Sequence, residues 1–288
     1  MKRRDFNKAL FASTAGVLTI NWKDFSAKKY VPPLACQTKF ENIDAVKAAG
    51  GSFIGSSVGE WLDPDGPEDE FLARVAKGKS ASLPIKICNG FIRPKHLHAT
   101  GPEANHDELM VYIEEVFRRA QRANVHMINF GSGGSRKIPE GYDYETAMDQ
   151  FIALLKRIGP LAAKYDLTVG VEQLRHQECN FINRISEVER VVRGANHPNI
   201  KAVADFYHMV TEGDTPADLK KVTDILMHVE IAELIDRRMP GTTNQDFKPY
   251  MSILKKAKYK GAISVEGRYE VSELANGFAT ITKQWLEA

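Results

Sequence analysis

The stretch TVGVEQL, residues 168–174, combines the features that decide the fold and the site. Val169 and Val171 alternate with Thr168, Gly170 and Glu172, which is the period of a β-strand with two unlike faces. In a parallel sheet covered by helices, the two valines would face the helices. Thr168 and Gly170 would then face the other side of the sheet, beneath an acid at the carboxyl end of the strand, where active sites of barrels are built.

Seven further apolar runs alternate with segments of helical periodicity. With the first stretch, the runs cover residues 31–37, 52–58, 84–91, 126–132, 168–174, 200–206, 226–233 and 261–267. Residues 106–123 and 144–165 carry apolar side chains at helical spacing. Eight strand–helix units predict a single α/β domain, a (β/α)₈ TIM barrel over residues 30–288. An open doubly wound sheet is the alternative, but VPPLACQTKF (residues 31–40) lacks the Gly-rich turn usual after its first strand.

Charge and composition exclude several classes of protein. The chain has 39 Lys and Arg against 37 Asp and Glu, but residues 1–29 hold seven of these bases and two of these acids. The remainder has 32 bases and 35 acids, which does not indicate a nucleic-acid-binding surface. No apolar run of eighteen residues predicts a membrane span. Three widely separated cysteines, Cys36, Cys88 and Cys179, indicate neither a disulfide framework nor structural zinc.

Residues 1–29 have the layout of an export signal. A basic start, MKRRDFNK, precedes an uncharged run over residues 9–22. The adjacent Arg3 and Arg4 resemble those of a twin-arginine signal, which predicts a periplasmic protein. No clean small-x-small cleavage site stands before Lys28, so removal of the leader and its retention as an anchor both stay open. The alternative is a basic amphipathic helix on a cytoplasmic protein.

Four consecutive runs carry an acid near their ends. These are Glu172, Asp205, Glu230 and Glu266. Because the carboxyl ends of barrel strands meet at one face, we expect the four carboxylates to lie close together. Mutual repulsion and burial make such a group unfavourable unless a cation joins it. One acid alone would indicate a loop or helix cap, but four predict a metal site, and oxygen ligands suit manganese, magnesium or calcium better than zinc.

Several motifs resemble one known family. VEQLRHQECNFIN (residues 171–183) is similar to a segment of sugar epimerases of the xylose isomerase-like barrel superfamily, where a metal-binding Glu begins a Glu-Pro-x-Asn-Arg-x-Glu-Thr-x-Phe-Leu-Asn pattern. ADFYHM (204–209) resembles the family's Asp-x-x-His-Met, KYKGAISVE (258–266) its last strand, and FGSGGSRKIPEG (130–141) its fourth strand and loop. The likeness spans about residues 31–270 and points to ketose 3-epimerases and hydroxypyruvate isomerase-like proteins among the sugar phosphate isomerases and epimerases.

The resemblance implies a divalent-metal-dependent isomerase or epimerase of a small carbohydrate. Glu172, Asp205 and Glu266 take metal-ligand positions, and Glu172 and Glu266 would also form the acid/base pair. Manganese (Mn²⁺) is the ion that it implies, with Mg²⁺ or Co²⁺ as alternatives.

The same resemblance suggests substrate-binding residues. His208 matches a substrate-contacting histidine, and Glu178 matches the acid that orients it. Either Arg237 or Arg238 would match an arginine in the loop after the seventh strand. Glu60, which follows the second strand, is expected either to contact substrate or to be an ordinary loop acid.

The chain departs from the family in ILMHVEIAE, residues 225–233. Relatives usually have His-x-His there, the second histidine binding metal, whereas this chain has His228 and Glu230, and Glu233 matches a downstream acid. Three hypotheses follow. Glu230 binds a hard cation with an arginine balancing the charge, or His228 is recruited from about 6.6 Å deeper in the strand, or the metal is lost.

The chemistry that the resemblance implies leaves alternatives open. A proton removed beside a carbonyl gives an enediolate, which can be reprotonated by an epimerase or isomerase. The same enolate can expel a leaving group, as in a lyase or dehydratase acting on keto-sugars or keto-glycosides. A metal-free, non-catalytic sugar-binding barrel is a third candidate. A DNA-repair endonuclease of this superfamily is disfavoured by the acidic balance and the few histidines at strand ends. Monomer and oligomer both remain open.

Overall fold

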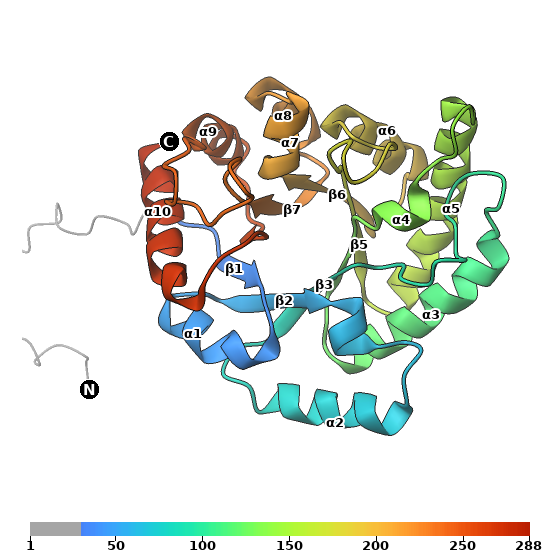
Figure 1. Ribbon diagram of the computed structural model, residues 1–288, viewed down its shortest axis with the longest axis horizontal. Coiled ribbons are helices and arrows are strands. Elements are labelled where there is room, and N and C mark those ends of the chain that lie inside the picture. The colour runs from blue at the N-terminus through green and yellow to red at the C-terminus, as the bar shows by residue number, and fades with distance from the viewer. Residues whose placement is uncertain (1–29) are drawn as a thin grey trace, which may run out of the picture. The chain divides into compact units, whose positions relative to one another are not determined.

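The eight predicted strands form a closed parallel barrel in the order of the sequence, as the computed structural model of residues 30–288 shows (Figure 1). The predicted leader, residues 1–29, lies outside the described residues. Each strand falls within one predicted run: β1 Leu34–Gln37, β2 Phe53–Ser57, β3 Ile85–Asn89, β4 Met127–Phe130, β5 Thr168–Glu172, β6 Ile200–Asp205, β7 Leu226–Ile231 and β8 Ile263–Val265. The predicted (β/α)₈ barrel is confirmed.

Helices surround this barrel (Figure 1). They are α1 Ile43–Ala48, α2 Glu68–Lys79, α3 His106–Arg122, α4 Gly133–Arg136, α5 Tyr144–Lys164, α6 Ile185–Ala195, α7 Phe206–Glu212, α8 Pro216–Val222, α9 Lys248–Lys256 and α10 Leu274–Glu287, with short turns η2 Phe40–Asn42, η3 Val58–Leu62 and η4 Val271–Glu273. The helices α3 and α5 match the two predicted helical segments. Side chains cap both, since Asn105 accepts from Glu108 N at 3.3 Å and Asp143 from Thr146 N at 2.7 Å. Within residues 30–288, no helix is long and apolar enough to span a membrane.

Side chains alternate across the barrel wall as the sequence predicts. Val169 and Val171 of β5 belong to the core between strands and helices. A separate apolar layer fills the barrel interior, and its fully or mostly buried members are Ala35, Phe53, Ile87, Met127 and Val203. A side chain at Gly170 would collide with Val203 and Met127 of this layer, so glycine lets the interior close. This apolar layer lies inside the barrel, directly below the polar residues at the strand ends.

The ends of β5 to β8 place the acids by register. In β6 and β7, Asp205 pairs with Glu230, and Glu230 in turn pairs with Ser264 of β8. Asp205 also begins α7, because its Oδ1 accepts from Tyr207 N at 2.7 Å and from His208 N at 3.4 Å. Strand pairing and this cap therefore bring His208 to the same end of the barrel as the carboxylates.

Candidate active site

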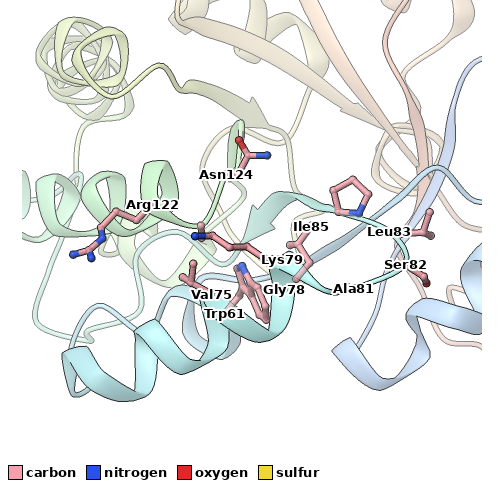
Figure 2. Close-up of a pocket in the computed structure, with 12 residues that line it drawn as sticks. Trp61, Val75, Gly78, Lys79, Ala81, Ser82, Leu83, Ile85, Arg122 and Asn124 are labelled. Atoms are coloured by element: carbon pink, nitrogen blue, oxygen red, sulfur yellow. The ribbon is translucent and has the colours of Figure 1, made fainter.

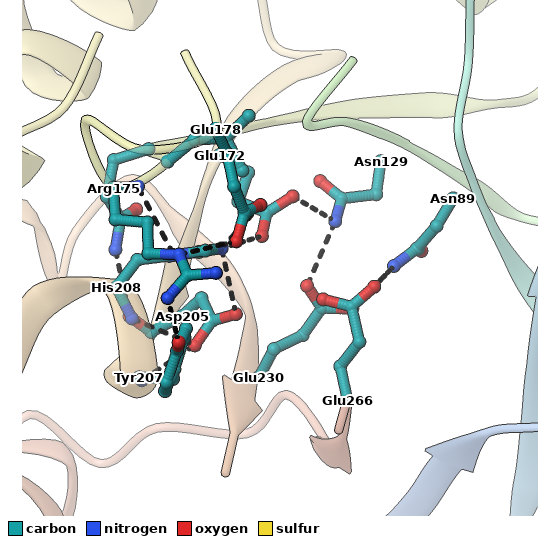
Figure 3. A network of polar contacts seen from close by, with 12 residues as sticks. Asn89, Asn129, Glu172, Arg175, Glu178, Asp205, Tyr207, His208, Glu230 and Glu266 are labelled. Carbon is teal, nitrogen blue, oxygen red and sulfur yellow. Dashed lines mark hydrogen bonds and ion pairs between the residues drawn. The ribbon is translucent and has the colours of Figure 1, made fainter. Parts of the chain in front are cut away.

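Four carboxylates converge at the carboxyl end of the barrel (Figure 3). One oxygen each from Glu172, Asp205, Glu230 and Glu266 lie within 4.8 Å of one another. The first three side chains are buried, and Glu266, just beyond β8, has 25% of its side chain exposed. The structure therefore brings together the four acids that the sequence predicted as one group.

Three amides from the opposite half of the barrel donate to this group, and the sequence reasoning missed them. Asn129 Nδ2 lies 2.8 Å from Glu172 Oε2 and 3.0 Å from Glu230 Oε2. Asn89 Nδ2 lies 3.0 Å from Glu230 Oε1 and 2.7 Å from Glu266 Oε1 (Figure 3). Gln37 Nε2 donates to Asn89 Oδ1 and, at 3.3 Å, to Glu230. All three stand at or near the ends of β1, β3 and β4, so a search for polar residues there, not only acids, would have found them.

Arg237 supplies a positive charge to the carboxylates. Its Nη2 lies 2.9 Å from Asp205 Oδ2 and 2.8 Å from Glu266 Oε2, and its Nε donates to the Glu266 backbone carbonyl at 3.1 Å. The guanidinium also lies over the ring of Tyr207, 4.9 Å from the centroid. Of the two arginines that the sequence left open, Arg237 is the one in this site. Arg238 pairs instead with Glu273 at 2.8 Å.

His208 faces the carboxylates with one ring nitrogen. Its Nδ1 accepts from the backbone N–H of Arg175 at 3.2 Å, which favours the tautomer of the neutral ring with its proton on Nε2, and Arg237 Nη2 lies farther away, 3.4 Å from Nε2. Nε2 lies 3.6 Å from Asp205 Oδ2, 3.8 Å from Glu172 Oε1 and 3.9 Å from Glu178 Oε2. Glu178 is itself held by Arg175 Nε at 2.7 Å (Figure 3). The predicted pair His208 and Glu178 therefore lies at the group, with His208 able to donate a hydrogen bond into it.

Burial dominates the protonation of these groups. It raises the pKa of the Glu172 carboxyl well above its usual range, and the charges of Glu266 and Asp205 raise it further. The pKa of Glu230 is raised in the same way, by burial and then by the neighbouring carboxylates. Burial also raises the pKa of Asp205, while Arg237 lowers it. Burial and the charge of Arg237 together lower the pKa of His208 to about 4, so this ring is neutral near pH 7.

The donor set fits a hard divalent cation. Glu172 Oε1 is buried and has no hydrogen-bond partner among residues 30–288, and Glu172 contributes one oxygen to the group of four. A buried, unpaired carboxylate oxygen is unfavourable, and a cation among the four acids would relieve both its isolation and their repulsion. A second possible set of ligands consists of Glu172, Asp205 and His208. In this set one imidazole nitrogen takes the place of the oxygens from Glu230 and Glu266.

Two other predicted residues stand apart from the group. Glu60 is exposed on η3, and among residues 30–288 it forms hydrogen bonds only with Ser57. Glu233 is buried but turned toward its own loop, where its carboxylate accepts from Gly241 N at 2.7 Å, Gln245 N at 3.2 Å and Thr243 Oγ1 at 2.6 Å. Glu233 therefore organises the loop after β7.

His228 lies below Glu230, with Nε2 4.0 Å from Glu230 Oε1. Its Nε2 has no hydrogen-bond partner among the described residues, and burial lowers its pKa to about 3. Of the two residues left open for β7, Glu230 joins the oxygen group and His228 lies outside both candidate ligand sets.

Two cavities have contrasting chemistry. One, of about 770 Å³, opens over the site, and Glu266, Arg237, Tyr207 and Glu178 line it. Another, of about 280 Å³, lies between α2, the end of α3 and the start of β3 (Figure 2). Its charged lining consists of Lys79 and Arg122, in the last turns of α2 and α3, where bases complement the helix dipole. Only the first cavity meets the carboxylate group.

The arrangement can now be compared with known proteins. Residues 43–287 match the model of a family described as the xylose isomerase-like TIM barrel. The chain belongs to this family. The family assignment covers nearly all of the barrel, including the four acids and His208.

Similar proteins include named sugar epimerases. The 3-dehydro-D-guloside 4-epimerase of Escherichia coli K12 is 29% identical over 125 residues, which cover 43% of this chain and 47% of that protein. This match therefore spans about half the length of the relative. The D-psicose 3-epimerase of Enterocloster bolteae is 22% identical over 227 residues, 78% of this chain and 75% of that protein. A crystal structure of 3-keto-D-glucoside 4-epimerase from E. coli shares the fold, with a TM-score of 0.72 at 17% identity over 88% of this chain and all of that one.

Proposed function

We propose that the protein is an isomerase or epimerase of a keto-sugar that moves a proton beside a carbonyl. The observation that carries this proposal is the placement of Glu172 and Glu266. Their carboxylates extend from the ends of two strands into one group, and Glu266 reaches the cavity above it. Two carboxyl groups at one carbon can serve as base and acid on its opposite faces. The names of the similar epimerases support the same class of reaction.

A divalent cation would be held by Glu172, Asp205, Glu230 and Glu266. Manganese is the ion we propose, with magnesium or cobalt as alternatives, because all four ligands are carboxylate oxygens. When bound, such an ion would polarise the carbonyl and stabilise negative charge on its oxygen.

The protein's own residues would bind the sugar and move the proton. One of the pair Glu172 and Glu266 removes the proton next to the carbonyl, and the other returns it to the opposite face or to the neighbouring carbon. His208 Nε2–H and the guanidinium of Arg237 would donate to sugar oxygens, since both point into the group. Asn89 and Asn129 keep Glu266 and Glu172 in place by hydrogen bonds.

Proton exchange tests this proposal directly. In deuterated water, a ketose or keto-glycoside should gain deuterium beside its carbonyl when incubated with the protein and Mn²⁺. We expect Glu172→Gln and Glu266→Gln each to reduce the exchange rate by at least about a thousandfold, because each removes a proton-transfer group. Glu60→Gln is the matched control and should retain the rate, because within the described part of the chain this exposed acid forms hydrogen bonds only with Ser57. Full exchange in both active-site variants would refute the assignment.

A lyase or dehydratase reaction on the same site is the second candidate. It begins with the same proton removal, but the enolate then expels a group from the adjacent carbon. Two observations support this candidate: one relative is named for a keto-glycoside substrate, and the cavity over the site has a volume of about 770 Å³. Analysis of the exchange products by NMR separates the two, because elimination releases a free aglycone and epimerisation does not.

A further inference from the structure

The cavity over the site is larger than one sugar ring requires. Its volume is about 770 Å³. A hexose has twelve non-hydrogen atoms. Even at roughly 30 Å³ for each, the share that a water molecule takes in the liquid, a hexose would fill about half of this space. Tyr207, Arg237 and Glu266 line the cavity, are buried or half-buried, and belong to the carboxylate site, so the reacting sugar ring would lie against them and leave the exposed part of the cavity open.

Leu234, Asp236 and Arg268 line the same cavity and are exposed, so they form its outer part. Leu234 is 45% exposed. The guanidinium of Arg268 has no ion-pair partner among residues 30–288. An apolar side chain and a guanidinium without an ion-pair partner among the described residues thus line the same outer part of the cavity.

The loops that carry these side chains are held in place. Glu233 is fully buried and accepts hydrogen bonds from Gly241 and Gln245, while Leu234 N donates to Gln245 Oε1 at 2.6 Å. The loop after β8 joins this scaffold, because Arg268 N donates to Arg237 O at 2.7 Å. Leu234 and Arg268 are therefore presented to the cavity by an ordered framework.

The side chains of Leu234 and Arg268 together favour binding of a neutral, flat, apolar group. A guanidinium stacks on aromatic rings, and a leucine side chain packs against the same kind of surface. Asp236 also lines the cavity, so its charge offsets that of Arg268 and a negatively charged substituent gains little there. Building on the proposed function, we propose that the outer part of the cavity, lined by Leu234 and Arg268, is a subsite for an aromatic aglycone. The preferred substrate is then an aryl glycoside of the keto-sugar.

Paired substrates test this subsite. With wild-type protein and Mn²⁺, proton exchange on phenyl 3-keto-glucoside should have a kcat/KM about tenfold above that on the methyl 3-keto-glucoside, which corresponds to about 1.4 kcal/mol. Leu234→Ala and Arg268→Gln should each lower the phenyl-to-methyl ratio toward one. Leu286→Ala is the matched control, since Leu286 is also an exposed leucine but does not line this cavity. Thermal melting checks that each variant is folded.

Binding separates the failure of this inference from failure of the proposed function. Calorimetry with phenyl and methyl β-D-glucoside, which cannot react, should show tighter binding of the phenyl compound and loss of that difference in Leu234→Ala. Equal binding and equal kcat/KM for the two aglycones would overturn the subsite while the proton-transfer function stands. If neither keto-glucoside nor any ketose exchanges but the phenyl preference in binding persists, the proposed function fails and the subsite stands.

Discussion

At the scale of single residues, the site depends on buried acidic side chains and on the groups that form hydrogen bonds with them. Glu230 is fully buried at the position where the resemblance to sugar epimerases implies a histidine, and three amides satisfy its oxygens. Those amides stabilise a carboxylate by hydrogen bonds that an imidazole could not accept in the same way. The sequence predicted that Glu230 faces the site, because alternation along one strand is local. The amides come from strands 100 or more residues away, so only the fold reveals them.

Replacing Glu230 by histidine should change the preferred metal. The carboxylate favours hard ions, while an imidazole ligand favours zinc or cobalt. We therefore expect Glu230→His to bind Zn²⁺ more tightly, and Mn²⁺ at least tenfold more weakly, than the wild type does in calorimetric titrations of EDTA-treated protein. Glu230→Gln is the control and should weaken both ions. An unchanged order of affinities in Glu230→His would exclude Glu230 as a ligand.

His228 should make the fold sensitive to acid. Its pKa is lowered to about 3 by burial, against about 6.5 in an unfolded chain, so below pH 6.5 the unfolded state binds the proton first. The contribution of neutral His228 to the free energy of unfolding is fully present above pH 6.5 and is lost as the pH decreases toward 3. At pH 4.5 this residue alone should lower the free energy of unfolding by about 3 kcal/mol.

The difference in urea-unfolding free energy between wild type and His228→Leu measures this contribution. The buried Glu172 and Glu230, whose raised pKa values act in the opposite direction, are common to both proteins and cancel. We expect the difference to change by about 3 kcal/mol between pH 7 and pH 4.5. A difference that is constant with pH would contradict a buried, neutral His228.

At the scale of elements, loops after the strands decide what surrounds the site. The alternation of 168–174 and the periodicity of 144–165 predicted β5 and α5 closely, because both patterns are set by neighbouring residues. The loop between β7 and α9 could not be derived in that way. Its shape follows from the buried carboxylate of Glu233, whose partners lie eight to twelve residues ahead.

Removing the Glu233 carboxylate should loosen this loop. Glu233→Ala removes a buried carboxylate and leaves the partly buried donors of Gly241, Thr243 and Gln245 without their acceptor, which should reduce the free energy of unfolding by about 3 kcal/mol. Hydrogen exchange of the Gly241 amide should accelerate as well. Glu273→Gln removes a half-exposed partner of Arg238 from a nearby loop and should cost less than about 1 kcal/mol. Equal effects of the two substitutions would mean that Glu233 is not the anchor.

At the scale of the whole molecule, the chain separates into a predicted leader and the barrel. The periplasmic location is a proposal that rests on the sequence of residues 1–29. Replacing Arg3 and Arg4 together by lysine should retain the protein in the cytoplasm, because the twin-arginine pathway reads the arginine pair. Cell fractionation measures this, with Lys23→Gln as a control within the same segment. Unchanged periplasmic yield of the double variant would refute a twin-arginine signal.

The sequence by itself determined the barrel and the four acids at its mouth. Strand alternation is local, and parallel strands necessarily bring their carboxyl ends to one face. Only the tertiary structure decided that Arg237 and not Arg238 meets the carboxylates, that Gln37, Asn89 and Asn129 hold them, and that Glu233 serves its own loop. These contacts depend on the conformation of the loop after β7 and on the packing of strands that are far apart in the sequence. Short-range sequence patterns predict neither of them.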